Sequence, residues 1–165
     1  MQAVSGDLSL KREKDERMEM SLKILILSDD AEVCRQLKRL IDPHPDWKVV
    51  GKMACDKALA ESQRKRSPDV VISEMSRLDA SMIPLISSLR VKFGSSKILA
   101  VSGQRDSRLV LRMIHAGAIG YLIMERASEE LAAAIQTVAS GGIYLSPGIA
   151  GLTRESVRHE TKKGK

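Results

Sequence analysis

Polar residues that could perform chemistry occur in this sequence at or just after the ends of short aliphatic runs. The polar residues at these positions are Ser28, Asp29, Asp30, Glu74, Ser102 and Glu125, and Met124 ends the last run. Parallel strands present their carboxyl ends at one edge of a sheet, and open α/β sheets bind ligands outside that edge. Carboxylates gathered there can bind a hard cation such as Mg²⁺ and raise one another's pKa. The sequence therefore predicts an acidic site, provided that the aliphatic runs are parallel strands.

Two of these residues have plainer interpretations, which the sequence leaves open. Asp30 precedes a helical pattern, so its carboxylate can cap that helix. Ser102 can be a loop hydroxyl that bonds to the backbone. Asp29 and Glu74 are therefore the stronger candidates for metal ligands and Asp30 is the weaker one. We expect no required cofactor and at most a weakly bound Mg²⁺ ion.

The aliphatic runs have the composition of buried parallel strands. They are short, rich in Val, Ile and Leu, and cover residues 23–28, 47–53, 69–74, 97–102 and 120–124. Their apolarity is continuous rather than alternating, which is typical of strands that are covered on both faces.

Segments with helical spacing separate these runs. Apolar residues recur every three or four positions in four segments, and a fifth segment is weaker: 33–41, 82–89, 109–116, 131–138 and 56–66. Gly117 and Gly141 suit helix ends, and Ser128 suits an N-cap that is followed by Glu129 and Glu130. The pattern predicts five strands that alternate with five helices in a doubly wound α/β fold.

The composition is that of a globular domain. The 165 residues are 43% hydrophobic and 29% charged, which excludes a disordered chain, and no apolar run approaches the ~18 residues of a membrane-spanning helix. No signal peptide is recognised, so we expect a cytoplasmic location. Cys34 and Cys55 fit neither a zinc module nor a disulfide framework. An aromatic content of 2% disfavours a single-stranded nucleic-acid platform.

Charge and pattern divide the chain into three segments. We expect a flexible charged extension over 1–21 with at most one or two helical turns, a domain over 22–147 and a basic tail over 148–165. Within the domain, LKILILSDD, SPDVVISEM, AGAIGYLIM and GGIYLSP resemble the receiver domain of two-component response regulators, most of all the NarL/LuxR class. The resemblance implies a CheY-like, flavodoxin-like sheet of five parallel strands in the order 2-1-3-4-5, with five helices.

The resemblance also implies roles for single residues. Receivers accept a phosphoryl group on an aspartate, and Glu74 stands at that position. Met124 stands where receivers have a lysine that contacts the phosphoryl group. Ser28 and Asp29 stand at the acidic pair that binds the metal ion, and Ser102 stands at the hydroxyl position.

Three of these positions depart from the family's chemistry. Glu74 is one methylene longer than aspartate, and a misplacement of about 1 Å can slow a reaction on the order of 100-fold. Met124 supplies no cation, and Ser28 removes one carboxylate. We therefore predict a pseudo-receiver that is not an enzyme and that regulates by protein–protein interaction without phosphorylation.

Two other functions stay open. Glu74 could imitate the phosphorylated state, with Ser102 and the switch aromatic Tyr121 turned inward. The sequence is equally compatible with a domain that does not respond to the signalling state. The alternative function is a working switch that accepts a phosphoryl group from a histidine kinase at Glu74, or at Asp29 or Asp30. A phosphate-binding enzyme is disfavoured because no Gly-rich loop follows the first strand and no His ends a strand.

A surface on two of the predicted helices is the candidate partner face. Its residues form a basic stripe on the predicted helix that contains the 109–116 pattern and a small or polar surface on the 131–138 helix: Arg105, Arg108, Arg112, His115, Ala132, Ala133 and Gln136. It fits a second copy of this chain or an acidic protein, although an ordinary solvated helix is the plainer interpretation. We expect a signalling protein as partner, a homodimer and no membrane contact. Sequence-specific DNA binding is not expected, because the chain after residue 147 is too short for a helix-turn-helix domain.

Overall fold

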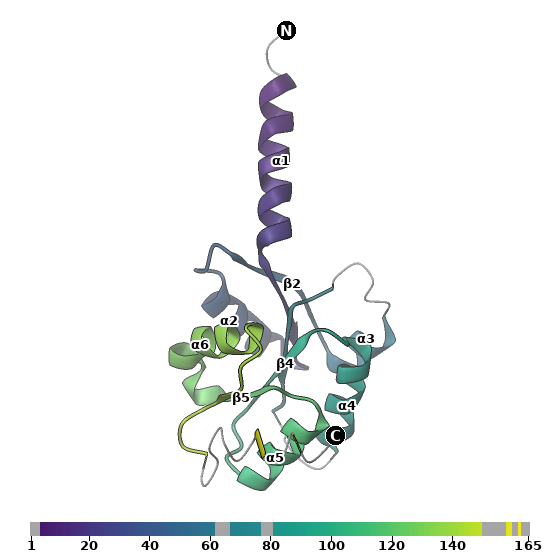
Figure 1. Ribbon diagram of the computed structural model, residues 1–165, viewed down its shortest axis with the longest axis vertical. Coiled ribbons are helices and arrows are strands. Elements are labelled where there is room, and N and C mark those ends of the chain that lie inside the picture. Colours follow the sequence, from purple (N-terminus) through teal and green to yellow (C-terminus); the bar gives the residue numbers. More distant parts are fainter. Residues whose placement is uncertain (1–3, 62–66, 77–80, 150–157, 160–161, 163–165) are drawn as a thin grey trace.

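A parallel β-sheet of six strands forms the centre of the computed structural model, which describes residues 4–61, 67–76, 81–149, 158–159 and 162 (Figure 1). The strands are β1 (Leu22–Leu27), β2 (Trp47–Met53), β3 (Val70–Glu74), β4 (Lys97–Ser102), β5 (Gly120–Ile123) and β6 (Tyr144–Leu145). Their order is β2-β1-β3-β4-β5-β6. The doubly wound fold and the order of the first five strands are confirmed, whereas the predicted count of five strands is too low.

The sixth strand escapes sequence analysis because it is short. Tyr144 and Leu145 pair in parallel with Gly120 and Tyr121. A strand of two residues leaves no recognisable aliphatic run, so only its pairing with β5 identifies it.

The helices cover both faces of the sheet (Figure 1). They are α2 (Ala31–Ile41), α3 (Cys55–Ala60), α4 (Met82–Lys92), α5 (Ser107–Ala116) and α6 (Ala127–Ala139), and a further helix, α1 (Val4–Met20), precedes β1. Along β1, Ile24 and Ile26 pack with α2 and α6, and Leu25 and Leu27 pack with α3, α4 and α5. Alternate residues of the strand are thus buried on opposite faces, which explains its continuous apolarity.

Helix ends agree with the sequence in three places and differ in one. One agreement is Gly141, which has a φ of +83° and directly follows Ser140, the C-cap of α6. The Asp30 carboxylate accepts the backbone N–H groups of Glu32 and Val33 and caps α2, and Gly117 ends α5 with a φ of +124°. The predicted cap at Ser128 is wrong. A 3₁₀ turn over Met124–Arg126 follows β5 directly and leads into α6 at Ala127, so Ser128 already lies inside the helix.

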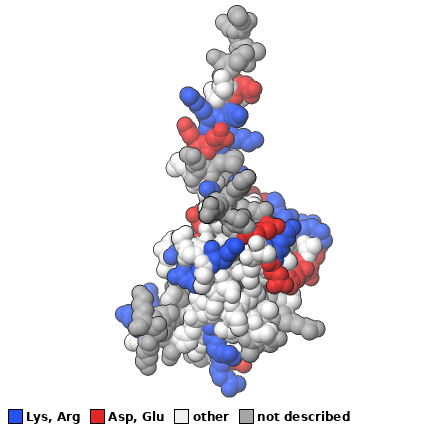
Figure 2. All heavy atoms as spheres, turned by 90° about the vertical axis from the view of Figure 1, so that its right-hand side faces the viewer, with Lys and Arg blue, Asp and Glu red and all other residues white. Residues whose placement is uncertain are grey.

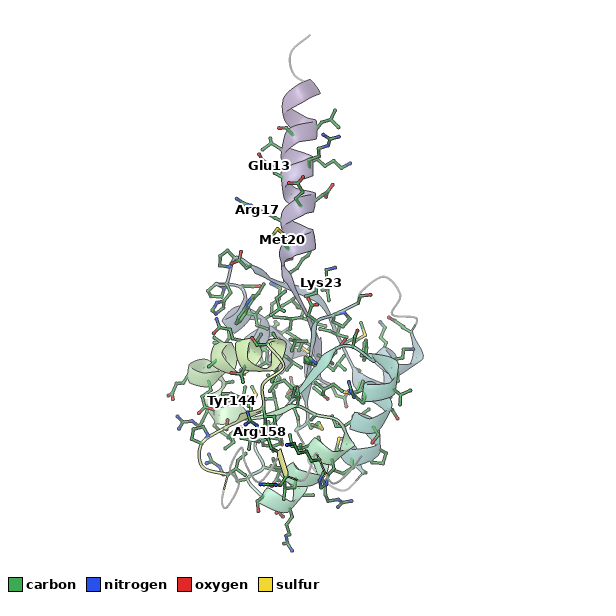
Figure 3. The ribbon with its side chains drawn as sticks, viewed as in Figure 1. Glu13, Arg17, Met20, Lys23, Tyr144 and Arg158 are labelled. Carbon is green, nitrogen blue, oxygen red and sulfur yellow. The ribbon has the colours of Figure 1, made fainter. Side chains whose placement is uncertain are left out.

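Residues before β1 form a helix longer than the sequence predicts. The helix α1 has 17 residues and projects from the amino end of the sheet (Figure 1). Glu13, Arg17 and Met20 point into solvent (Figure 3), and basic and acidic side chains are interspersed along the helix (Figure 2). Strong helix formers and oppositely charged residues spaced by four explain why more than two turns form.

Three further expectations concern a membrane-spanning helix, the tail and the helix over 56–66. No helix among the described residues is long and apolar enough to cross a membrane. The predicted tail over 148–165 and the end of the predicted 56–66 helix lie mostly outside the described residues, and the described part of that helix is α3.

Candidate functional site

Asp29 and Glu74 line one pocket of about 440 Å³ at the carboxyl end of the sheet. Asp29 follows β1, and Glu74 is the last residue of β3. The remaining lining comes from α3, the segment after β3 and the start of α4: Cys55, Asp56, Met75, Ser76, Ser81, Met82 and Leu85. Because β1 and β3 are parallel neighbours, their register brings Asp29 and Glu74 to the same edge.

Glu74 is buried and bonded at both carboxylate oxygens. Only 7% of the residue is exposed. The Ser28 hydroxyl donates to Oε2 at 2.5 Å, and the Ser76 hydroxyl donates to Oε1 at 3.1 Å. The carboxylate that the sequence places at the phosphoacceptor position is therefore already engaged by two hydroxyl groups.

Ser28 organises the loop after β1. Its hydroxyl donates to Glu74 and accepts the backbone N–H of Asp30 at 3.0 Å. The Asp30 carboxylate in turn accepts from the first turn of α2 and does not line the pocket. The capping interpretation of Asp30 therefore describes its contacts, whereas a metal-binding role has no support from them.

Met124 and Glu125 do not join the acidic pocket. Met124 is half-buried and packs against the cluster that α2 and α6 form with the sheet. Glu125 is exposed, and its Oε1 would lie 3.1 Å from a Cβ atom added to Gly103, after β4. Of the carboxylates predicted to gather at this edge, the structure brings Asp29 and Glu74 together, uses Asp30 to cap α2 and leaves Glu125 on the β4–β5 side.

Ser102 and Tyr121 form a second polar group at the ends of β4 and β5. Tyr121 is fully buried, and its hydroxyl donates to the Gln104 carbonyl at 2.8 Å. The Ser102 hydroxyl accepts the Gln104 N–H at 3.3 Å. Burial raises the pKa of Tyr121, and its hydrogen bond to Ser102 opposes that shift. Tyr121 thus lies inward, with Gln104 as its partner.

Both cysteines are buried beside the acidic site. The Cys34 thiol lies 3.9 Å from the Ser28 carbonyl, and the Cys55 thiol lies 4.0 Å from the Ser73 hydroxyl. Burial raises the pKa of Cys34 and raises that of Cys55 to about 11. Both therefore stay protonated near neutral pH and are poor nucleophiles and poor metal ligands.

The residues present fit a magnesium ion poorly. Among the described residues there is no group of three or more His, Cys, Asp or Glu side chains that could hold a metal ion. Both oxygens of Glu74 accept hydrogen bonds from hydroxyl groups, and Asp30 caps α2. Asp29 and Asp56 remain as exposed carboxylates in the pocket. We therefore derive no chemical step through a metal.

The residues of the candidate partner face are mostly exposed. Arg108, Arg112 and His115 lie on α5, and Arg105 lies in the loop before it rather than on the helix. On α6, Ala133 and Gln136 are exposed and Ala132 is half-buried. Arg108 lies 3.7 Å from Asp106, so one carboxylate partly offsets the basic stripe.

Sequence reasoning missed several polar residues around the site. Ser76 bonds Glu74 from two positions downstream, a spacing that could have suggested it. Asp56 adds a carboxylate to the pocket from the start of α3, and Gln104 holds the Tyr121 hydroxyl through a backbone carbonyl. Glu130, predicted only as a first-turn acid, is buried, and it accepts hydrogen bonds from three residues: Arg126, Tyr144 and Ser146. No sequence signal points to the last two contacts.

The sequence of this chain is similar to one known family and to known regulatory proteins. The sequence matches the response regulator receiver domain family over residues 24–136. It is 30% identical over 129 residues to the transcriptional regulatory protein UhpA of Salmonella typhimurium, covering 78% of this chain and 64% of UhpA. It is 26% identical over 126 residues to the transcriptional regulatory protein DegU of Brevibacillus brevis, covering 76% of this chain and 53% of DegU. The chain thus spans about half to two thirds of the length of these relatives.

Solved structures share the fold. A two-component response regulator of the LuxR family from Aurantimonas sp. SI85-9A1 is 26% identical with a TM-score of 0.70, over 86% of this chain and 99% of that one. The isolated receiver domain of RcsB from Salmonella enterica serovar Typhimurium in the apo form has a TM-score of 0.69 at 18% identity, over 79% and 96% of the two chains. The second likeness establishes the fold alone.

Proposed function

This chain belongs to the response regulator receiver domain family, and from that premise we propose that it is a pseudo-receiver. In this proposal it regulates a two-component-type pathway in the cytoplasm by binding a protein partner, without being phosphorylated. The observation that carries the proposal is the engagement of both Glu74 oxygens by the hydroxyls of Ser28 and Ser76.

The contacts of Glu74 argue against phosphoryl transfer to it. An attacking oxygen must lie in line with the donor phosphorus, and nearly all of the catalysis by such sites is positioning and charge stabilisation. Here one oxygen is bonded to Ser28 at 2.5 Å and the residue is buried. Attack would require an oxygen that already accepts a hydroxyl hydrogen bond to align with the donor phosphorus.

The surroundings of Met124 argue in the same direction. A transferred phosphoryl group carries charge that a nearby cation must offset. The thioether of Met124 is uncharged and packs against the α2 and α6 side of the core. The pocket lining that the structure describes contains Asp29, Asp56 and Glu74 and no Lys or Arg, so a phosphate there would meet like charge.

The position of Tyr121 bears on the idea that Glu74 imitates the phosphorylated state. Tyr121 lies inward, as that idea requires. Among the described residues, however, the hydroxyl partners of Glu74 are Ser28 and Ser76, and the Tyr121 hydroxyl donates to Gln104. We therefore propose that Tyr121 is held by the β4–α5 loop and not by Glu74.

Incubation with acetyl phosphate or beryllium fluoride in the presence of Mg²⁺ tests the proposal. We expect no added phosphoryl mass and no chemical-shift changes along α5, because the acceptor is engaged and no cation faces it. Rapid, stoichiometric labelling at Glu74 or Asp29 would instead establish the alternative function, a receiver that works as a phosphorylated switch.

The partner face is proposed to be the exposed surface of α5 and α6. We expect Arg108→Glu combined with Arg112→Glu to weaken binding to an acidic partner by about tenfold or more, because the new carboxylates repel it. We expect the same variant to weaken self-association, because it removes both arginines from this face. Sedimentation velocity on the full chain measures self-association. Arg35→Glu with Arg39→Glu on α2 is the matched control, since it makes the same charge change at two exposed sites. Equal association of both double variants and the natural chain would contradict this face.

A further inference from the structure

The segment that follows β6 crosses the carboxyl end of β5. We call residues 146–149 the strap. The Ser146 N–H donates to the Tyr121 carbonyl at 2.9 Å, and the Ser146 hydroxyl accepts the Ile123 N–H at 2.9 Å. Ser146 therefore continues the pairing of β6 and bonds β5 both at Tyr121 and two residues beyond it.

The start of the strap is fixed to α6 through Glu130. The Ser146 hydroxyl donates to Glu130 Oε2 at 2.6 Å, and the Tyr144 hydroxyl donates to the same oxygen at 2.8 Å. Arg126 pairs with the other oxygen. Tyr144 lies close to α6 in Figure 3. All three donors converge on a residue that is only 8% exposed, so this end of the strap is firmly held.

The far end of the strap reaches the opposite face of the sheet. Gly148 has a φ of +95°, and a Cβ atom added to it would lie 3.5 Å from Arg105 Nη1. Ile149 is 6% exposed and belongs to the same buried cluster as Tyr121 and Val110. The left-handed backbone at Gly148, which glycine adopts readily, turns the chain so that Ile149 enters this core.

Hydrogen bonds link Tyr121 both to the strap and to the loop before α5. Its carbonyl is bonded to Ser146, and its hydroxyl is bonded to Gln104. The residue after Gln104 is Arg105, whose Nη1 would lie 3.5 Å from a Cβ atom added to Gly148 in the strap. We infer that the strap locks Tyr121 inward, so that release of the strap and outward movement of Tyr121 are one event. This inference concerns contacts within the chain and does not rest on the proposed loss of phosphorylation.

Fluorine NMR of the full chain labelled with 3-fluorotyrosine tests the inference. The chain has two tyrosines, so it gives two resonances, which Tyr121→Phe assigns. We expect Ile149→Asp to move the Tyr121 resonance toward that of a solvent-exposed tyrosine and to lower the pKa of this phenol toward its ordinary value. Ile149→Ala is expected to act in the same direction while leaving the fold intact. Val91→Asp is the matched control, because Val91 is 85% exposed on α4.

Coupling must also act in reverse, because linkage between two equilibria is reciprocal. We expect Tyr121→Ala to increase the hydrogen-exchange rate of the Ser146 amide, which donates to the carbonyl of residue 121, by about 5- to 150-fold, the usual range for coupled sites. The inference is overturned if both Ile149 variants stay folded while the Tyr121 resonance and titration match those of the natural chain. Unchanged exchange at the Ser146 amide in folded Tyr121→Ala overturns it equally.

Discussion

The triple variant Ser28→Asp, Glu74→Asp and Met124→Lys is expected to accept a phosphoryl group from acetyl phosphate at least about 100-fold faster than the natural chain. The shorter acid at position 74 moves its oxygens by about 1 Å, and misplacement of that size costs on the order of 100-fold in rate. It also withdraws the carboxylate from the Ser76 hydroxyl, which reaches Glu74 at 3.1 Å.

The other two changes supply charges that phosphoryl transfer needs. Asp at position 28 adds a carboxylate beside Asp29, so we expect tighter Mg²⁺ binding as well. Lys at position 124 adds a cation that can offset charge on the transferring group. Intact-mass spectrometry after timed incubation measures the labelled fraction, and isothermal titration measures Mg²⁺ binding.

Two controls make the reconstruction informative. Gln136→Lys adds the same positive charge as Met124→Lys, but on the exposed surface of α6, and should leave the chain unlabelled. Each single change should give far less labelling than the triple variant, because the three groups act on one transition state. A triple variant that keeps a native spectrum and stays unlabelled would show that the substitutions are not the cause of inertness.

Glu130→Ala is expected to lower the free energy of unfolding by about 2–4 kcal/mol. The substitution leaves the hydroxyls of Tyr144 and Ser146 without their acceptor in the core, where 8% and 3% of these residues are exposed. Arg126 is 43% exposed, so solvent screens its ion pair and that contact adds little. Urea unfolding followed by the fluorescence of Trp47 measures the loss.

The same carboxylate makes stability depend on pH. Burial raises the pKa of Glu130, but hydrogen bonds from Ser146, Arg126 and Tyr144 outweigh it, so the pKa lies below its ordinary value. A lowered pKa means that the stabilisation is complete above the ordinary glutamate pKa and is lost as pH falls through the folded value. We expect Glu130→Gln to lose stability at pH 7 and to be less sensitive than the natural chain to acid.

A neighbouring acid provides the control for both measurements. Glu129→Ala removes an ion-pair partner of Arg126. The side chain of Glu129 is 71% exposed, so the substitution should change the free energy of unfolding by no more than about 0.5 kcal/mol. If Glu130→Ala lowers the free energy of unfolding no more than Glu129→Ala does, the hydrogen bonds to Glu130 do not stabilise the fold.

The sequence by itself determined five of the six strands and the residue types at the carboxyl end of the sheet. Aliphatic runs such as 69–74 identify strands because a strand covered on both faces must be apolar throughout. Asp30 is recognisable as a cap because capping depends on residues two and three positions away. The types at positions 74 and 124 are read directly, so no structure is needed to see that residue 124 carries no positive charge.

Only the tertiary structure decided where the polar side chains point. Ser28 and Glu74 are 46 residues apart, and their hydrogen bond exists because β1 and β3 pair in a particular register. Glu130 is a surface acid by its neighbours in sequence, yet β6 brings Tyr144 and Ser146 onto it. Hydrogen bonds require both partners within about 3 Å at a suitable angle. Local sequence patterns set the elements, but such distances between elements are set only when the whole chain has packed.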